Sequence, residues 1–289
     1  MNYTKIIRLN TLPFAENVRV YSTDRLVVTA MAGPMDLLTP VMRVQQAEGA
    51  VSLTSAVDSW SFGQGNYLVI SHIQPAMWPP KRSEPMLAIA EVVGAVALEN
   101  PGLLGETVFE GVVVVNHQVI HQPNGPVRLA TPTQLNPEAF SATLRRALDD
   151  VGRLGLEDLE RFRLASRWYV RGLEALNPVD KFLHWYIALE VYPAMGGDVV
   201  KSIQDLLREK VYPGVDKGKL KERLQLGTIC NLRGDIVHKG LAIVDLPSSP
   251  RFDQAMQRLE ALVPVCIRLI TGLPPGTDLD RWVLGGEQG

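Results

Sequence analysis

The sequence has few cysteines, no long apolar run and almost no excess charge. The two cysteines, Cys230 and Cys266, both fall in apolar helical patterns, which is typical of buried free thiols in a reducing compartment. No apolar stretch reaches the roughly 20 residues that a membrane span needs. The N-terminus also lacks the apolar core of a signal peptide. We therefore expect a cytoplasmic protein that does not enter membranes.

The net charge of -2 argues against generalised binding to a polyanion. Residues 137–272 carry 20 Lys and Arg against 18 Asp and Glu, a small positive balance. If nucleic acid binds to this chain, we expect it to bind at a local cleft. The composition, with 46% hydrophobic and 21% charged residues, is that of a folded globular protein. A length of 289 residues then predicts two domains.

The N-terminal part, residues 1–133, is predicted to be an α+β domain. Short β-type runs alternate here with turn-forming residues, whereas residues 84–98 favour a helix because alanine and leucine recur without β-branched dominance. No motif in this domain indicates a function. The predicted strands are residues 5–9, 18–22, 26–30, 51–57, 67–72, 107–120 and 127–130.

The C-terminal part, residues 134–272, is predicted to be an all-α helical bundle. Asn136-Pro137, Asn177-Pro178 and Ser249-Pro250 each combine a polar capping residue with proline, a pattern typical of helix starts. Residues 273–289 are rich in glycine and proline and are predicted to form a loose tail, anchored only by its tryptophan, Trp282. The predicted helices cover residues 137–153, 156–176, 178–193, 198–210, 218–239 and 250–271.

The candidate catalytic residues, Arg233 and His238, lie five positions apart on a predicted helix. On a regular helix this spacing points the two side chains about 140° apart and separates them by about 7.5 Å along the axis. Two features favour their meeting at a helix end. Arginine is long, and Gly234 loosens the helix between them while Gly240 favours its termination.

An arginine and a histidine without a carboxylate cluster suit RNA cleavage by the RNA's own 2′-hydroxyl group. The nucleophile belongs to the substrate, so this chemistry needs neither a metal nor another cofactor. Histidine transfers protons near neutral pH, and the planar guanidinium of arginine matches two phosphate oxygens. DNA lacks the 2′-hydroxyl and should be inert. Because one histidine supplies only half of an acid–base pair, we also predict a homodimer in which two motifs face one another.

The segment Leu232–Gly240, LRGDIVHKG, resembles the Arg-x4–6-His motif of HEPN domains, and more closely the LR-x-x-IVHG form of the Apea-like HEPN group. Upstream, Phe182–Glu190 reads FLHWYIALE and is similar to the apolar helix that ends in IALE in the same group. The order of the elements agrees as well. The resemblance covers residues 137–272 and does not extend to the N-terminal domain.

The resemblance implies an RNA-binding protein that cleaves RNA without a metal, in a toxin-like defence or stress role. It assigns Arg233 to the phosphate and His238 to proton transfer, with Glu190 and Asp235 as supporting residues. Glu190 would orient a base such as Arg233, or form a stabilising ion pair within the bundle. Active members of the family usually carry a polar residue directly after the arginine, where this chain has Gly234. A non-catalytic module that binds RNA or a partner protein, and a toxin silenced by an antitoxin-like partner, therefore stay open.

Further basic residues flank the motif. Lys217, Lys219, Lys221 and Arg223 open the motif helix, and Lys239 follows the histidine. They are candidates for holding the RNA backbone. The alternative is an ordinary solvated segment, because a cluster of lysines near a helix start is usually exposed.

Two other patterns could each mark a site. Arg163, Arg167 and Arg171 recur every fourth residue and could follow RNA phosphates, although this pattern is typical of a solvated helix face. His117 and His121 fall on a predicted strand, where four positions span roughly 13 Å, too far to share one metal ion. No metal site is therefore predicted.

Overall fold

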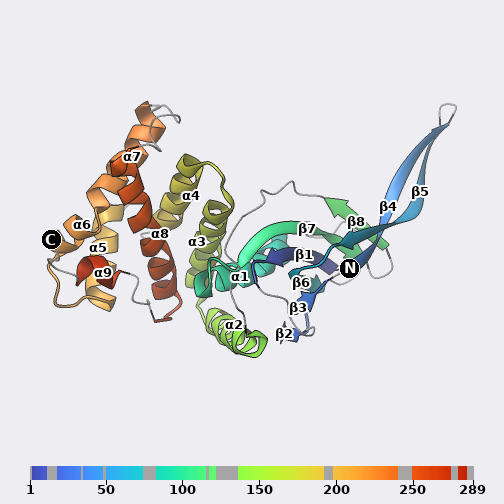
Figure 1. Ribbon diagram of the computed structural model, residues 1–289, viewed down its shortest axis with the longest axis horizontal. Helices are drawn as coiled ribbons and strands as arrows, with labels where there is room; N and C mark the ends of the chain where they lie inside the picture. The colour runs from blue at the N-terminus through green and yellow to red at the C-terminus, as the bar shows by residue number, and fades with distance from the viewer. Residues whose placement is uncertain are drawn as a thin grey trace. The chain divides into compact units, whose positions relative to one another are not determined.

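The computed structural model describes residues 2–11, 18–33, 35–47, 50–73, 83–114, 117–121, 136–191, 198–239, 249–274 and 279–284. The chain divides into two compact units, Met1–Asp149 and Asp150–Gly289. The first contains an antiparallel sheet with a helix and the second is helical (Figure 1). This arrangement confirms the predicted fold class. None of the helices within the described ranges is long and apolar enough to cross a membrane.

The first unit is built on six antiparallel strands in the order β2-β3-β6-β1-β7-β8. Ile6 of the central strand lies opposite Val69 and Phe109, and Ile6, Tyr67 and Phe109 form a buried apolar cluster. The elements are β1 (Asn2–Leu9), β2 (Val18–Ser22), β3 (Leu26–Ala32), β4 (Met35–Ala47), β5 (Ala50–Phe62), β6 (Asn66–Ile73), α1 (Ser83–Glu99), β7 (Leu104–Val114) and β8 (His117–His121).

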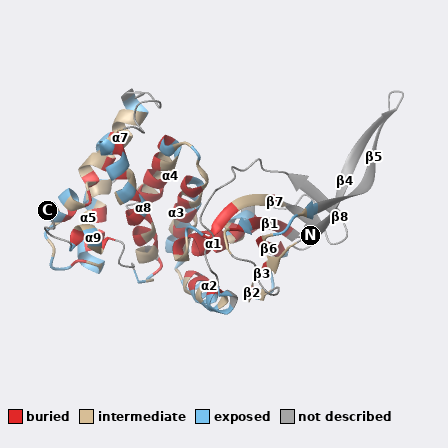
Figure 2. Ribbon diagram, viewed as in Figure 1, coloured by how far each residue is buried: buried red, intermediate tan, exposed pale blue. Residues whose placement is uncertain are grey.

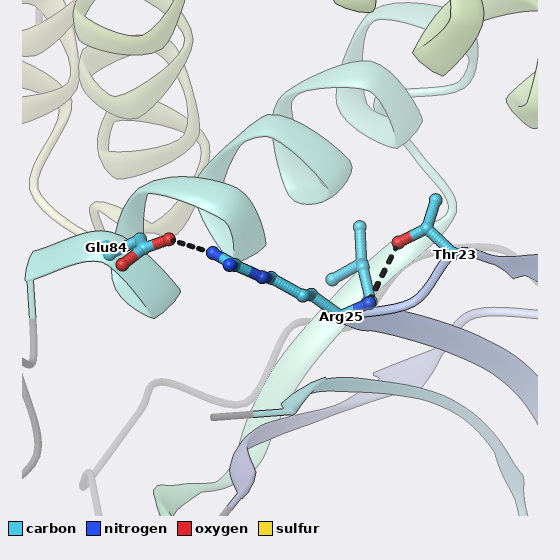
Figure 3. A network of polar contacts seen from close by, with 4 residues as sticks. Thr23, Arg25 and Glu84 are labelled. Carbon is cyan, nitrogen blue, oxygen red and sulfur yellow. Dashed lines mark hydrogen bonds and ion pairs between the residues drawn. The ribbon is translucent and has the colours of Figure 1, made fainter. Parts of the chain in front are cut away.

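Helix α1 packs on β1 and β6, as its mostly apolar sequence requires. Val92 and Val96 are fully buried in this contact region. At the start of α1, Glu84 forms a 3.0 Å ion pair with Arg25, which precedes β3 (Figure 3). The Arg25 amide also donates a hydrogen bond to Thr23 Oγ1. Both charged side chains are exposed, so this pair contributes at most about 1 kcal/mol to stability.

The strands of the first unit differ from the predicted ones in two places. Strand β4, which contains Pro40, was not predicted. It pairs with β5 in a two-stranded hairpin, where a missing N–H on one edge is tolerated (Figure 1). The predicted strand 107–120 is an antiparallel pair, β7 and β8, because a β-branched run does not reveal where a chain reverses. The predicted strand 127–130 lies outside the described residues.

Helix α2 (Pro137–Gly152) lies where the two units meet in sequence. The division between the two compact units falls after Asp149, within α2. Ser141 Oγ donates a 3.0 Å hydrogen bond to the carbonyl of Val20 in β2. This bond gives α2 a specific contact with the sheet. The sequence of α2 does not predict that contact.

The second unit contains seven further helices among the described residues. Their bounds agree with the predicted helices to within a few residues, except in the motif region and the tail. They are α3 (Leu156–Glu174), α4 (Pro178–Val191), α5 (Val199–Lys210), α6 (Lys217–Arg223), α7 (Leu226–Lys239), α8 (Pro250–Ile270) and α9 (Asp280–Val283).

Helix α4 packs between α3 and α8, as its nearly all-round apolar sequence predicts (Figure 2). Trp185 and Phe182 are buried, and Trp185 Nε1 donates a hydrogen bond to the carbonyl of Tyr169 on α3. A Cβ atom at Gly172 of α3 would lie only 2.2 Å from Trp185 Cδ1. The absence of a side chain at Gly172 is thus what allows α3 to approach the tryptophan ring.

The predicted helix 218–239 is two helices, α6 and α7, separated at Leu224 and Gln225. Gln225 has a φ of 52°, in the left-handed region that ends a helix. Its amide Nε2 donates a hydrogen bond to Gln254 Oε1 on α8. No glycine or proline marks this break, so tertiary contacts override the local helical pattern.

Residues 279–284, within the segment predicted to be a tail, contain the short helix α9. Leu279 and Val283 are buried, and Tyr212 donates a 2.7 Å hydrogen bond to Asp280. Trp282 contacts Arg258 of α8, as expected of an anchor. A short helix with two apolar residues gives little sequence signal, which explains why α9 was missed.

Candidate functional site

Arg233 and His238 meet at the C-terminal end of α7. Arg233 Nη1 lies 3.5 Å from His238 Nε2, although the two positions point about 140° apart on the helix. The helix runs unbroken through Gly234, so the length of the arginine side chain, and not a break at the glycine, brings the groups together. His238 is exposed to solvent and Arg233 is half-buried.

Helix α4 holds the Arg233 guanidinium from the other side. Arg233 Nη2 lies 3.4 Å from Glu190 Oε1, and its Cζ atom lies 5.8 Å from the centre of the Tyr186 ring. Arg233 and Glu190 each keep 32% of their side-chain surface exposed. One edge of the guanidinium therefore faces the carboxylate while Nη1 faces the histidine.

Two residues at this site were not predicted from the sequence. Tyr186 donates a 3.6 Å hydrogen bond to Cys230 Sγ, beneath Arg233. Burial and this bond raise the pKa of Tyr186 well above its usual value, so its hydroxyl stays neutral. The helical spacing carried a signal: Tyr186 precedes Glu190 by four residues and Cys230 precedes Arg233 by three, which places each pair on one face.

The remaining cysteine takes no part in this site. Cys266 is buried within α8, and burial raises the pKa of its thiol to about 12. The thiol is therefore protonated and unreactive at neutral pH.

The predicted RNA-binding residues do not gather at the motif. Lys217 forms an ion pair with Asp205 of α5, which holds the pKa of that carboxyl below its usual value. Lys219 and Lys221 are exposed on α6, at the opposite end of α7 from His238. The rise of α7 from its first residue to His238 is about 18 Å. The side chain of Lys239 lies outside the described residues.

Other predicted residues are placed as follows. Asp235 is half-buried on α7, between the two motif residues in sequence. His117 and His121 lie on one strand, β8, as predicted, and their side chains are outside the described set. Among the side chains that the structure describes, no three His, Cys, Asp or Glu residues are grouped as metal ligands would be.

The motif end of α7 can thus present one exposed imidazole and one oriented guanidinium to a bound anion. A guanidinium has five N–H donors, and Arg233 directs only some of them at Glu190. The remaining donors can bind an anion. An oxyanion placed beside Nη1 would also be within reach of the imidazole. This is the geometry of a phosphate-binding group next to a proton-transfer group.

The chain matches no protein-family model, no curated protein and no solved structure.

Proposed function

We propose that the C-terminal unit is an RNA-binding bundle of the HEPN superfamily, Apea-like group, and acts as a metal-independent endoribonuclease in a defence or stress role. The observation that supports this proposal is the 3.5 Å separation between Arg233 Nη1 and His238 Nε2 at an exposed helix end. The FLHWYIALE and LRGDIVHKG segments supply the resemblance, and they contact one another through Glu190 and Arg233.

The proposed reaction is transesterification within the RNA. His238 removes the proton from a 2′-hydroxyl, and the 2′-oxygen attacks the adjacent phosphorus. The bond from phosphorus to the 5′-oxygen breaks, and that oxygen takes up a proton. The products are a 2′,3′-cyclic phosphate and a 5′-hydroxyl. Arg233 binds the non-bridging oxygens, on which negative charge increases in the transition state.

Glu190 positions the arginine in this scheme. Its ion pair with Nη2 fixes the guanidinium plane while leaving Nη1 toward His238. A partly exposed pair of this kind contributes little to stability, roughly 0–1 kcal/mol. The role of this ion pair is therefore to orient the Arg233 guanidinium.

A homodimer would complete the acid–base pair. Each chain offers one histidine to the motif, and the leaving oxygen needs a second proton-transfer group. Val237, next to His238, is 50% exposed and could be covered in a contact between copies. We propose a two-fold arrangement in which the two α7 ends face one another.

The test is cleavage of end-labelled RNA in the presence of EDTA. Wild-type protein should cut RNA, whereas His238→Ala and Arg233→Ala should lose activity by about 100-fold or more. Arg153→Ala is the matched control, because Arg153 is an exposed arginine of the same unit that pairs only with Asp150 among described residues. Intact RNA with the wild-type protein across varied substrates, or unchanged cleavage by His238→Ala, would contradict the proposal.

A second candidate is a non-catalytic module that binds RNA or a regulatory partner such as an antitoxin. Two observations favour it: Gly234 offers no polar side chain beside Arg233, and Glu190 already occupies part of the guanidinium. This candidate predicts that RNA or partner binding persists in His238→Ala with no cleavage by the wild-type protein. Purification of the native protein without any stable neighbour would count against a silencing partner.

A further inference from the structure

A second group of cationic side chains lies at the other end of the bundle, around Trp282. Arg223 of α6, Arg258 of α8 and Arg281 of α9 form this group, which we call the tail arginine cluster. Arg258 Nε donates a 3.4 Å hydrogen bond to the carbonyl of Arg223, and Arg223 Nη1 donates to the carbonyl of Val283. Three helices that are distant in sequence thus bring their arginines to one place.

Trp282 fixes the spacing of two of these guanidiniums. The Cζ atom of Arg281 lies 3.8 Å from the centre of the indole ring, and that of Arg258 lies 5.0 Å from it. Cation–π contacts of this kind hold a guanidinium by its face and leave its N–H edges available. The indole ring of Trp282 therefore positions Arg258 and Arg281, and both guanidiniums contact it.

The three arginines of the tail arginine cluster have no ion-pair partner in the described part of the chain. Asp280, which precedes Arg281, accepts a hydrogen bond from Tyr212 instead of pairing with an arginine of the cluster. Burial and the charge of Arg281 lower the pKa of Arg258 below its usual value. Like charges held together without a counter-charge are costly unless an anion binds there.

We propose that the tail arginine cluster binds the phosphate backbone of the same RNA that the motif end of α7 cleaves. This inference rests on the proposed function for the identity of the ligand. Each guanidinium keeps unused N–H donors, and a planar fork matches the two non-bridging oxygens of a phosphodiester. The exposed side chains of Lys219 and Lys221 on α6 add positive charge beside α9.

The position of the cluster is compatible with an RNA strand that extends away from the cleavage site. Arg223 of the cluster precedes α7, and α7 rises by about 18 Å from its first residue to His238. Because Trp282 already carries two guanidiniums, we expect contacts with phosphates and not with bases. Binding at the cluster should therefore be independent of sequence and equal for single-stranded RNA and DNA, although only RNA is cleaved.

The experiment measures binding of labelled single-stranded RNA by fluorescence anisotropy in the His238→Ala background, which removes cleavage. Arg258→Gln/Arg281→Gln should weaken binding at least tenfold, because two charge-assisted contacts are lost. The slope of log affinity against log salt should fall by about 1.4, at about 0.7 for each phosphate contact with a single strand. The control, Arg153→Gln/Arg161→Gln, makes the same change in net charge at two ion-paired arginines of the same unit and should alter neither value.

Three results separate this inference from the proposed function. If the His238→Ala protein binds RNA and the cluster variant binds it equally well, the inference is wrong and the nuclease proposal stands. If the cluster variant and the control lose affinity equally, the effect is one of net charge, and the inference is again wrong. If the His238→Ala protein binds no RNA, both fail. Circular dichroism spectra that match the parent would show that the variants fold.

Discussion

Arg233 Nη1 lies 3.5 Å from His238 Nε2, although their five-residue spacing directs them about 140° apart around α7. The contact exists because Glu190 and Tyr186 of α4 hold the guanidinium from one side while the helix end leaves the imidazole exposed. The motif is thus completed by a neighbouring helix, and its properties depend on α4 as well as on α7.

The first prediction concerns Glu190. Glu190→Gln removes the partner charge of Arg233, so the guanidinium should lose its fixed orientation. We expect kcat for RNA cleavage to fall by about tenfold with little change in KM, because the arginine itself remains. The free energy of unfolding should change by less than about 1 kcal/mol. A large loss of stability with normal kcat in the folded fraction would show that Glu190 is only structural.

The second prediction compares two glycines. Among the described residues, and apart from the backbone of its own helix, no atom lies within 4 Å of a Cβ built at Gly234, so Gly234→Ala should stabilise α7 by about 0.5–1 kcal/mol. Gly172→Ala should instead destabilise the bundle by about 1–3 kcal/mol or more, because its Cβ would clash with Trp185. Urea unfolding of both variants measures the difference. Equal effects would contradict the described packing of α3 on α4.

The third prediction concerns Tyr186. Its raised pKa keeps the phenol neutral throughout the working pH range, so it cannot serve as the general base that removes the 2′-hydroxyl proton. Tyr186→Phe should leave the pH profile of cleavage unchanged, whereas Tyr186→Leu, which removes the ring beneath Arg233, should lower the rate. A shifted pH profile for Tyr186→Phe would assign the phenol a chemical role that the account denies.

The fourth prediction concerns His72 in β6, which is 5% exposed and whose Nδ1 has no hydrogen-bond partner among the described residues. Burial lowers its pKa, more than the nearby carboxylate of Glu84 raises it. As the pH falls, the imidazole of His72 is therefore protonated at a higher pH in the unfolded chain than in the folded chain. Stability should be full above pH ~6.5 and fall by up to about 1.4 kcal/mol per pH unit below it, until the folded pKa is reached.

Thermal unfolding of the wild-type protein and of His72→Phe between neutral and mildly acidic pH tests this. The unfolding temperature of the variant should depend less on pH in that window than that of the wild-type protein. Hydrogen exchange of the β6 amides should show the same difference. Parallel pH dependences for the two proteins would contradict the assignment to His72.

Much of the fold follows from the sequence because its signals are local. Paired polar and proline residues such as Asn177-Pro178 mark helix starts, and the apolar run that contains Trp185 predicts a buried helix. Gln225 shows where such reasoning ends: the turn between α6 and α7 depends on a left-handed residue whose side chain bonds to Gln254 on α8. No residue type near it announces that turn.

Only part of the candidate site follows from local sequence signals. Arg233, His238 and Glu190 follow from motif sequences, but Tyr186 and Cys230 belong to the site through packing between two helices. Lys217 was predicted as a cation for RNA, and the structure adds its ion pair with Asp205. Which lysine pairs with which carboxylate depends on the approach of α5 to α6, and no pattern within one helix specifies that approach.

The most direct test of the central claim is the role of the RNA 2′-hydroxyl. We would compare an RNA cleaved by the wild-type protein in EDTA with the same RNA carrying a single 2′-deoxy nucleotide at the cleaved position. The account predicts loss of cleavage at that position and, from the all-RNA substrate, products that end in a 2′,3′-cyclic phosphate. Unchanged cleavage of the deoxy substrate, or products with a 3′-hydroxyl and a 5′-phosphate, would contradict it.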